Sequence, residues 1–217
     1  MQNLTDIQAR FNRAASTWDE NPARAQMADS IASAMRAQVP FDNTKTVLDF
    51  GCGTGLVSLQ LQPYARRIIG IDSAPGMLAV LDDKVRGSSL TNVETICLDL
   101  CTQPAPQLHA DIIVSAMALH HIADIPALLQ TLVQLLTPGG FLALADLDSE
   151  DGSFHADKTG VYHAGIDRNW LVAQLQTLGV HQISAMTAHT IERPSETGPR
   201  QYPIFLISGN MPVLPAS

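Results

Sequence analysis

A carboxylate at the end of an apolar strand, followed by a glycine-rich turn, is the feature of this chain with the clearest chemical meaning. Residues 46–50 read Thr-Val-Leu-Asp-Phe, and residues 51–55 read Gly-Cys-Gly-Thr-Gly. An apolar, β-branched run is typical of a central parallel strand that is covered on both faces. Asp49 is costly to bury without a partner. The glycines let the backbone turn sharply and let a ligand approach the main chain.

Three interpretations of this turn are open. A dinucleotide-binding turn has the spacing G-x-G-x-x-G and directs a helix N-terminus at a pyrophosphate. Here the third glycine, Gly55, comes one residue earlier, and Asp49 would repel a pyrophosphate. A ligand with a positively charged amino group suits the turn better. A strand-turn-helix without a ligand is the third interpretation, with Thr54 as the cap of a helix that begins at Leu56.

A second predicted strand, residues 67–72, also ends in a carboxylate. Asp72 lies 21 positions after Gly51, close to the interval of ~20 residues at which an acidic residue meets a ribose diol in nucleotide-binding βαβ units. A carboxylate can accept hydrogen bonds from both hydroxyls of the diol. Ser73 is the candidate cap of the helix that follows, and Pro75 lies in its first turn.

Together these segments resemble the class I S-adenosylmethionine (SAM)-dependent methyltransferases. The turn matches the D-x-G-x-G-x-G pattern of that family, and residues 70–78 resemble its G-x-D-x-S-x-x-M-L pattern. Three further segments follow in the family's order: an acidic residue after the strand at 93–97, the pair of histidines after the strand at 111–116, and the L-x-P-G-G-x-L hairpin at 136–142. The resemblance covers roughly residues 41–148.

The resemblance implies a SAM site built from the ends of these strands. Asp49 would lie near the methionine part of SAM, Met77 would pack on the adenine ring, and Asp99 would contact the adenine amino group. An ordinary core methionine and a solvated loop aspartate are the alternatives for the last two. The complete predicted set of cofactor contacts is Asp49, Gly51, Cys52, Gly53, Asp72, Ser73, Met77, Asp99, Leu100, Ser115 and Ala116.

Alternating strands and helices position these residues. The predicted strands lie near 46–50, 67–72, 93–97, 111–116 and 141–146, and the helices between them lie near 55–62, 76–86 and 124–136. This alternation predicts an α/β fold, doubly wound around a mostly parallel sheet. The resemblance implies a seven-stranded Rossmann-like sheet, which the runs 180–187 and 202–208 would complete with an antiparallel last strand. Two helices near 7–18 and 24–39 predict a helical lid over residues 1–40, ahead of a SAM-binding domain over residues 41–217.

Residues outside this alternation are the candidates for the acceptor site. The candidate acceptor contacts are Phe11, Trp18, His155, Tyr162 and His163. Histidine titrates near neutral pH and suits a general base, so the candidate catalytic residues are His120, His121, His155 and His163. Packing beneath the cofactor is the alternative for the adjacent pair, and solvated loop residues are the alternative for the other two. The acidic run 146–151 could hold a divalent cation, as in catechol-type methyltransferases, but we expect a solvated loop and no metal.

Composition narrows the range of partners. The chain has 217 residues and a formal net charge of −8, which disfavours nucleic acid. No N-P-P-Y segment follows the fourth strand, which also argues against DNA methylation. No apolar run approaches the ~20 residues that span a bilayer. The N-terminus lacks a signal-peptide pattern, and the three cysteines lack a metal-ligand pattern, so we expect a cytoplasmic protein.

These observations predict a SAM-dependent methyltransferase that acts on a small-molecule acceptor by in-line methyl transfer and releases S-adenosylhomocysteine (SAH). The ubiquinone/menaquinone-biosynthesis enzymes are the subgroup that the chain resembles. One alternative is a SAM-binding protein without methyl transfer, acting as a sensor or partner subunit. Another SAM-type reaction on the same fold is the second alternative. The acceptor, its reacting atom and the oligomeric state stay open at this stage.

Overall fold

Seven strands form one mixed sheet in the computed structural model, which describes residues 4–194 and 198–213. The strand order is β3-β2-β1-β4-β5-β7-β6. The strands are β1 Thr46–Phe50, β2 Arg67–Asp72, β3 Val93–Cys97, β4 Ala110–Ala116, β5 Leu136–Leu147, β6 His181–Arg193 and β7 Arg200–Asn210. The first five strands pair in parallel, and β7 runs antiparallel to both of its neighbours. The predicted Rossmann-like sheet is therefore confirmed.

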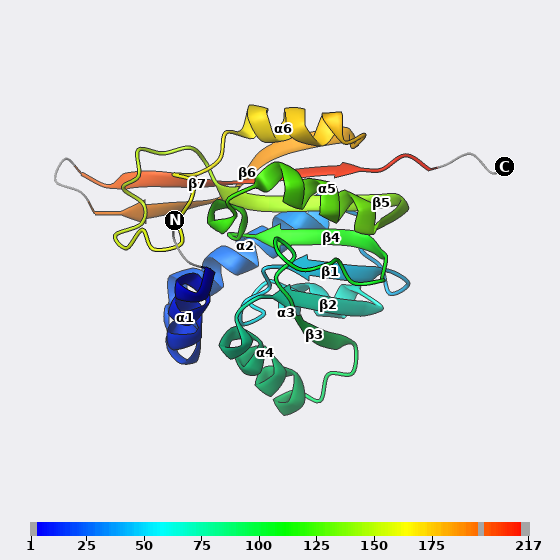
Figure 1. The fold of residues 1–217 in the computed structure, drawn as a ribbon, viewed down its shortest axis with the longest axis horizontal. Helices are drawn as coiled ribbons and strands as arrows, with labels where there is room; N and C mark the ends of the chain where they lie inside the picture. Colours follow the sequence, from blue (N-terminus) through cyan, green and yellow to red (C-terminus); the bar gives the residue numbers. More distant parts are fainter. Residues whose placement is uncertain (1–3, 195–197, 214–217) are drawn as a thin grey trace.

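Helices cover both faces of this sheet (Figure 1). They are α1 Leu4–Ala14, η1 Ala15–Glu20, α2 Pro22–Gln38, α3 Ser58–Leu61, η2 Gln62–Tyr64, α4 Pro75–Gly87, η3 Leu119–His121, α5 Ile125–Leu135 and α6 Arg168–Thr177, where η denotes a 3-10 helix. Side chains alternate across β4, since Ile113 packs with α5 and α6 whereas Ile112 and Val114 pack with α2 and α3. Within the described ranges, no helix is both long and apolar enough to cross a membrane.

Some boundaries differ from the prediction. Strand β5 already begins at Leu136, because this residue pairs with Ala110 before the register shift at Ile112. The β6–β7 hairpin is also longer than expected, since pairing continues to Arg193 and Arg200. Residues 195–197 of the predicted loop that joins these strands lie outside the described residues.

The predicted helix caps at Thr54 and Ser73 are wrong. Gly55 has a φ of +82°, which a right-handed helix does not allow, so the turn continues and α3 begins only at Ser58. The Thr54 hydroxyl is then free to bind elsewhere. Helix α4 begins one residue later than a cap at Ser73 requires, behind Ala74, and has no side-chain cap.

The N-terminal segment falls into two parts. Helix α2 belongs to the core, because Ile31 and Met35 are fully buried under the sheet. Helix α1 ends at Ala14 and the chain continues as the 3-10 helix η1. Figure 1 shows α1 on the side to which the arrowhead of β4 points, together with the insert 148–167 between β5 and α6. Residues 4–20 and this insert therefore meet at the edge where the parallel strands end.

Candidate functional site

The glycine turn is bound to the neighbouring strand and leaves space at one position. The N–H groups of Gly51 and Cys52 both donate to the Ile71 carbonyl, at 2.8 and 3.1 Å. A side chain at Gly51 would meet the Cβ atom of Ala118 at 2.5 Å, so this glycine is needed for packing. Gly53 has a φ of +55°, and no atom lies within 4 Å of the position that its Cβ would take. The open space at Gly53 lets a ligand approach the backbone.

Asp49 supplies a buried carboxyl group beside the turn. The residue is 2% exposed, and the Ser58 hydroxyl donates to its Oδ2 at 2.5 Å. Oδ1 has no hydrogen-bond partner among the described residues. Burial raises the pKa of Asp49 to about 7, while the Ser58 hydrogen bond opposes this shift and the nearby Asp72 adds to it. A positive charge would stabilise the ionised carboxylate, so this position favours a cationic group of a ligand.

Asp72 holds the same turn from the end of β2. Its Oδ2 accepts a hydrogen bond from the Gly53 N–H at 2.9 Å, and its Oδ1 accepts one from the Ala74 N–H at 2.8 Å. Burial raises the pKa of Asp72, against the effect of these two donors. Each carboxylate oxygen has a further lone pair for a hydroxyl donor. The link between Asp72 and Gly53 was not predicted, although it explains why the turn and the second carboxylate occur together.

Met77 lies beneath the N-terminal segment. It is 2% exposed and packs with Ala74, against Phe11 and Trp18. Phe11 and Trp18, which are predicted to contact the acceptor, therefore pack against Met77, which is predicted to contact the adenine ring. In this arrangement Met77 is a core methionine, and its contact with an adenine ring stays a prediction.

Asp99 takes part in a local turn after β3. Its carboxylate accepts hydrogen bonds from the Cys101 N–H at 2.9 Å and from the Thr102 hydroxyl at 2.8 Å. Leu100 is buried behind it. These contacts agree with the alternative of a loop aspartate, and the predicted adenine contact is again left as a prediction.

The end of β4 carries two features that no sequence pattern indicates. Met117 directly follows the strand with a φ of +57°, a conformation that is rare for a residue with a long side chain. The hydroxyl of Ser115 is buried and has no hydrogen-bond partner in the described ranges. Strained backbone and unpartnered polar atoms concentrate at functional sites. Both features occur beside the glycine turn, where Ala118 contacts Gly51.

Two polar residues bind the N-terminal segment to the predicted cofactor side. The Gly76 N–H donates to Asn12 Oδ1 at 2.7 Å. Asp19 accepts a hydrogen bond from the Thr54 hydroxyl at 2.7 Å and pairs with Lys84 at 2.5 Å. Thr54 belongs to the glycine turn, so residues 4–20 contact this turn directly. Neither Asn12 nor Asp19 was among the predicted site residues.

The same segment also contacts the insert. Ile7 packs over Gly160, whose Cβ would lie 2.8 Å from the Ile7 side chain. Arg10 donates to the Thr159 carbonyl and pairs with Asp157 at 3.4 Å. The N-terminal segment therefore bridges the glycine turn and the insert.

Three of the four candidate histidines come together at this edge. His120 and His121 lie in η3 with ring centroids 4.1 Å apart. The ring of His155, from the insert, lies 5.0 Å from that of His120 and 5.9 Å from that of His121. Phe11 contacts His121 edge-on at 5.1 Å. We call His120, His121 and His155 the histidine cluster.

Two members of the histidine cluster are neutral at neutral pH. Burial lowers the pKa of His121 to about 3, and the neighbouring His120 adds to this shift. Burial also lowers the pKa of His155 to about 4, with contributions from His120, Arg10 and Arg193. The Nε2 atom of His155 is buried without a hydrogen-bond partner among the described residues. The cluster therefore offers polar nitrogen atoms beside aromatic rings, as small-molecule pockets do.

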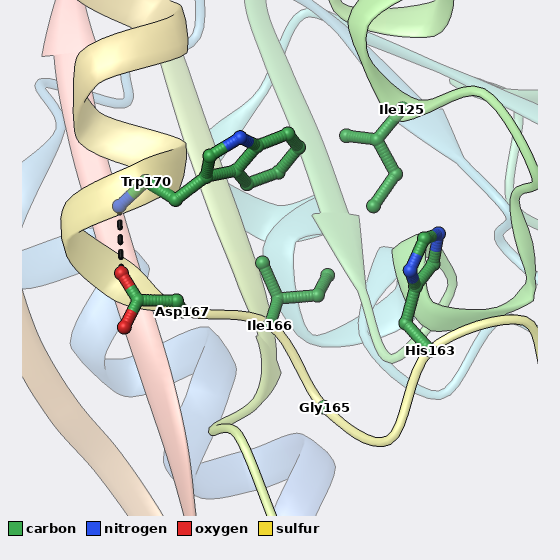
Figure 2. A pocket seen from close by; sticks show the side chains of 6 residues that line it. All are labelled: Ile125, His163, Gly165, Ile166, Asp167 and Trp170. Atoms are coloured by element: carbon green, nitrogen blue, oxygen red, sulfur yellow. Dashed lines mark hydrogen bonds between the residues drawn. The ribbon is translucent and has the colours of Figure 1, made fainter.

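His163 and Tyr162 are not part of this cluster. Figure 2 shows the His163 ring beside Ile125, in a separate pocket with Trp170. This pocket is shallow, with a volume of about 210 Å³, and His163 Nε2 lies 2.8 Å from the Ile122 carbonyl oxygen. Tyr162 is 37% exposed. The backbone N–H groups of Tyr162 and His163 nevertheless donate to the His120 carbonyl, at 3.0 and 3.3 Å, so both residues adjoin the histidine cluster through their main chain.

The acidic run after β5 is occupied by ion pairs. Both carboxylate oxygens of Asp148 accept hydrogen bonds from Arg168, at 2.6 and 2.5 Å. Asp151 pairs with Arg200 at 2.8 Å. Over residues 4–194 and 198–213, no three histidine, cysteine or acidic side chains are placed to hold a metal ion. The geometry therefore gives no support to the alternative of a cation site.

The fold and this edge define the class of protein. The sheet order, the glycine turn after β1 and the carboxylates at the ends of β1 and β2 are those of a nucleotide-binding α/β protein. The buried Asp49 beside the open position of Gly53 fits a nucleoside ligand with a positively charged amino group, such as SAM.

Comparisons with known proteins agree with this class. Residues 47–140 match the family described as "Methyltransferase domain". The chain is 37% identical over 135 residues to an uncharacterized methyltransferase of Schizosaccharomyces pombe, covering 55% of this chain and 47% of that protein. It is 34% identical over 134 residues to a trans-aconitate 2-methyltransferase of Azoarcus sp., covering 59% and 50%. The structure of a DhpI–SAH complex is 22% identical with a TM-score of 0.72, covering 96% of both chains, which is a likeness of fold.

Over residues 47–140 the chain is thus similar to the SAM-dependent methyltransferases that its sequence resembles. It spans about half the length of these two curated relatives.

Proposed function

We propose that this chain transfers the methyl group of SAM to a small-molecule acceptor by in-line displacement. The observation that carries this proposal is the open position of Gly53 beside two carboxylates, the buried Asp49 and the partly buried Asp72. SAM supplies a methyl group that its sulfonium already activates. The protein therefore has to align the acceptor with that group and exclude water.

The proposed cofactor contacts combine the acceptors at Asp49 and Asp72 with the contacts that the family resemblance implies. Asp49 Oδ1 would accept a hydrogen bond from the SAM amino group, and Asp72 would accept hydrogen bonds from the ribose hydroxyls. Gly51 and Gly53 would let the ligand approach the backbone. Met77, Asp99 and Leu100 would contact the adenine ring. The remaining proposed contacts are Cys52, Ser73, Ser115 and Ala116.

The acceptor would bind between the N-terminal segment and the insert, next to the histidine cluster. Phe11 supports this position, because it packs near Met77 on one side and contacts His121 on the other. Aromatic rings with a few polar nitrogens suit a small, partly apolar molecule. Because α2 belongs to the core, we restrict the proposed lid to residues 4–20.

The proposed lid would cover the cofactor, because Asn12 accepts a hydrogen bond from the Gly76 N–H and Asp19 accepts one from the Thr54 hydroxyl. SAM would therefore enter when these hydrogen bonds open, and the lid would close again over both substrates. Closure over the reactants is a common way to exclude water from a transfer reaction.

Calorimetry and a turnover assay test this function together. We expect SAM and SAH to bind at micromolar strength and NAD not to bind. With labelled SAM and a metabolite extract, we expect SAH and one labelled small molecule to form. SAM binding without SAH formation would favour the sensor or partner-subunit alternative. NAD binding in place of SAM would contradict the proposal altogether.

A further inference from the structure

Asp146 is a buried carboxylate that the proposed cofactor and acceptor contacts do not use. It lies near the end of β5 and is fully buried. Its Oδ2 accepts a hydrogen bond from the Leu119 N–H at 2.8 Å, and its Oδ1 accepts one from the Leu147 N–H at 2.7 Å. Burial raises the pKa of Asp146, but His120 and the Leu147 N–H outweigh burial and the pKa is lowered overall. Asp146 is therefore an ionised carboxylate inside the protein.

This carboxylate determines the tautomer of His120. The Nδ1 atom of His120 lies 2.6 Å from Asp146 Oδ1. An ionised carboxylate can only accept hydrogen bonds, so Nδ1 carries the proton and the lone pair of the neutral ring is on Nε2. Nε2 of His120 has no hydrogen-bond partner in the part of the chain that the structure describes.

The other two members of the histidine cluster lack such a partner. His121 Nδ1 faces the Gly160 carbonyl, and His155 Nε2 has no partner among the described residues. Their lowered pKa values make both rings weak bases at neutral pH. Of the three rings, His120 is the one that is hydrogen-bonded directly to a carboxylate, which would stabilise the imidazolium ion formed when the ring accepts a proton.

We propose that His120 Nε2 is the general base of the transfer and that Asp146 is its positioning residue. The acceptor is then a small molecule with a hydroxyl group that must lose a proton, such as a phenol. This inference rests on the proposed function and names its class of substrate.

The step balances as follows in atoms and electrons. The hydroxyl oxygen forms a bond to the methyl carbon, and the electron pair of the breaking carbon–sulfur bond stays on sulfur. The hydroxyl proton moves to His120 Nε2, and the imidazolium ion later releases it to water. The products are a methyl ether, SAH and one proton.

The location agrees with this assignment. Ala118, two residues before His120, lies against the glycine turn at Gly51. Phe11 joins the histidine cluster to the packing around Met77. His120 is 1% exposed, so a hydroxyl would reach its Nε2 atom only when the N-terminal segment opens.

Two variants of His120 distinguish a role as general base from a purely structural role. In His120→Asn, the amide nitrogen can take the place of Nδ1 and keep the hydrogen bond to Asp146, but no base is left. We expect this variant to melt within a few degrees of the parent and to bind SAH equally well. Its kcat on an ordinary phenol should fall by about a hundredfold or more. His120→Gln, which loses the bond to Asp146, serves as the comparison for a structural defect.

An acceptor that is already ionised provides the matched control. A nitro-substituted phenol, ionised at the assay pH, needs no base, so His120→Asn should methylate it at a rate near that of the parent. A structural role for His120 would slow both phenols equally. Equal losses on the two phenols, or full activity on the ordinary phenol, would overturn the proposal.

Nitrogen NMR of the histidine rings tests the hydrogen bond between His120 and Asp146 without an activity assay. We expect the His120 ring in the parent to be protonated on Nδ1, and Asp146→Asn to abolish this preference. Protonation on Nε2 in the parent would refute the assignment. The pH profile of this signal has to be interpreted with Asp146, His121 and His155, which face the ring, and with Arg10 and Arg193, which act on His155.

The two proposals fail in different ways. A protein that binds SAH but methylates nothing in the extract fails the proposed function. A protein that methylates carboxylates but no hydroxyl compound fails this inference alone.

Discussion

Gly53 provides a sharp test of the cofactor site at the scale of a single residue. A methyl group at this position has no neighbour within 4 Å, and the φ of +55° is left-handed. We expect Gly53→Ala to lose only about 1–2 kcal/mol of stability through this backbone conformation. The methyl group would nevertheless fill the space proposed for SAM, so SAM affinity should fall by about tenfold or more, as calorimetry would show.

Gly179 is the matched control for this substitution. It also has a left-handed φ, +82°, and open space at its Cβ position, but it follows α6. Gly179→Ala should lose similar stability and keep the parent's SAM affinity. Equal affinities in both variants would place the cofactor elsewhere.

Asp49 should make SAM binding depend on pH. Its pKa of about 7 means that the carboxyl is mostly protonated at about pH 6 and mostly ionised at about pH 8. Because only the ionised form attracts the SAM amino group, affinity should rise about tenfold across this interval. Asp49→Asn should bind SAM more weakly, with little change over the same interval. A parent protein whose affinity is constant from about pH 6 to about pH 8 would contradict this role.

The raised pKa of Asp49 also affects the stability of the ligand-free protein. An aspartate in the unfolded chain ionises near pH 4, whereas Asp49 in the folded protein keeps its proton until about pH 7. Over this interval the folded state binds more protons, so its stability decreases as pH rises. Binding of a cationic ligand to the ionised form would offset this loss.

A residue of the site is predictable from the sequence when its binding partners lie close to it in the chain. Asp49 and the glycine turn are predictable because the pattern is contained within 46–55. Asp146 binds His120 across 26 positions, and Asn12 binds Gly76 across 64. Such contacts depend on how the sheet folds, which no local pattern encodes.

At the scale of elements, the lid should be needed for transfer and not for cofactor binding. Deleting residues 1–20 removes Phe11, Trp18 and the contacts of Asp19 but keeps the glycine turn. We expect the truncated protein to bind SAM and to lose methyl transfer, because water would reach the site. Full turnover by the truncated protein would place the acceptor at another edge.

A milder change tests how the lid is held. Asp19→Ala removes the bonds to Thr54 and Lys84, so amide hydrogens of residues 4–20 should exchange faster and kcat should fall. Asp29→Ala, on exposed α2 surface, is the control and should change neither. Unchanged exchange in Asp19→Ala would show that the apolar packing and the contacts of Asn12 and Arg10 are enough to hold the lid.

Local signals explain which elements were predicted well. The cap of α6 is an example of a local signal, since the Asp167 carboxylate accepts a hydrogen bond from the Trp170 N–H at 2.7 Å and the pattern lies within four residues. The cap at Thr54 failed because Asp19, 35 positions away, takes its hydroxyl. Tertiary contacts here override a local preference.

At the scale of the whole molecule, we expect methyl transfer to be independent of metal ions. The acidic residues Asp148 and Asp151 are paired with arginines, which leaves them engaged in place of a cation. EDTA should leave kcat unchanged, and added Mg²⁺ should have no effect. Activity that vanishes with EDTA and returns with Mg²⁺ would show that the acidic run holds a cation after all.

The ends of the insert are joined to each other at the sheet. Ile166 donates to the Leu147 carbonyl at 2.8 Å, and Glu150 donates to the Ala164 carbonyl at 2.9 Å. Gly165 lies so close to Asp148 that no side chain fits between them. A loop whose ends are fixed in this way can change in length between them at a small entropic cost. Residues 151–163 could therefore differ in length without disturbing the sheet or the glycine turn, and such a change would alter the proposed acceptor site alone.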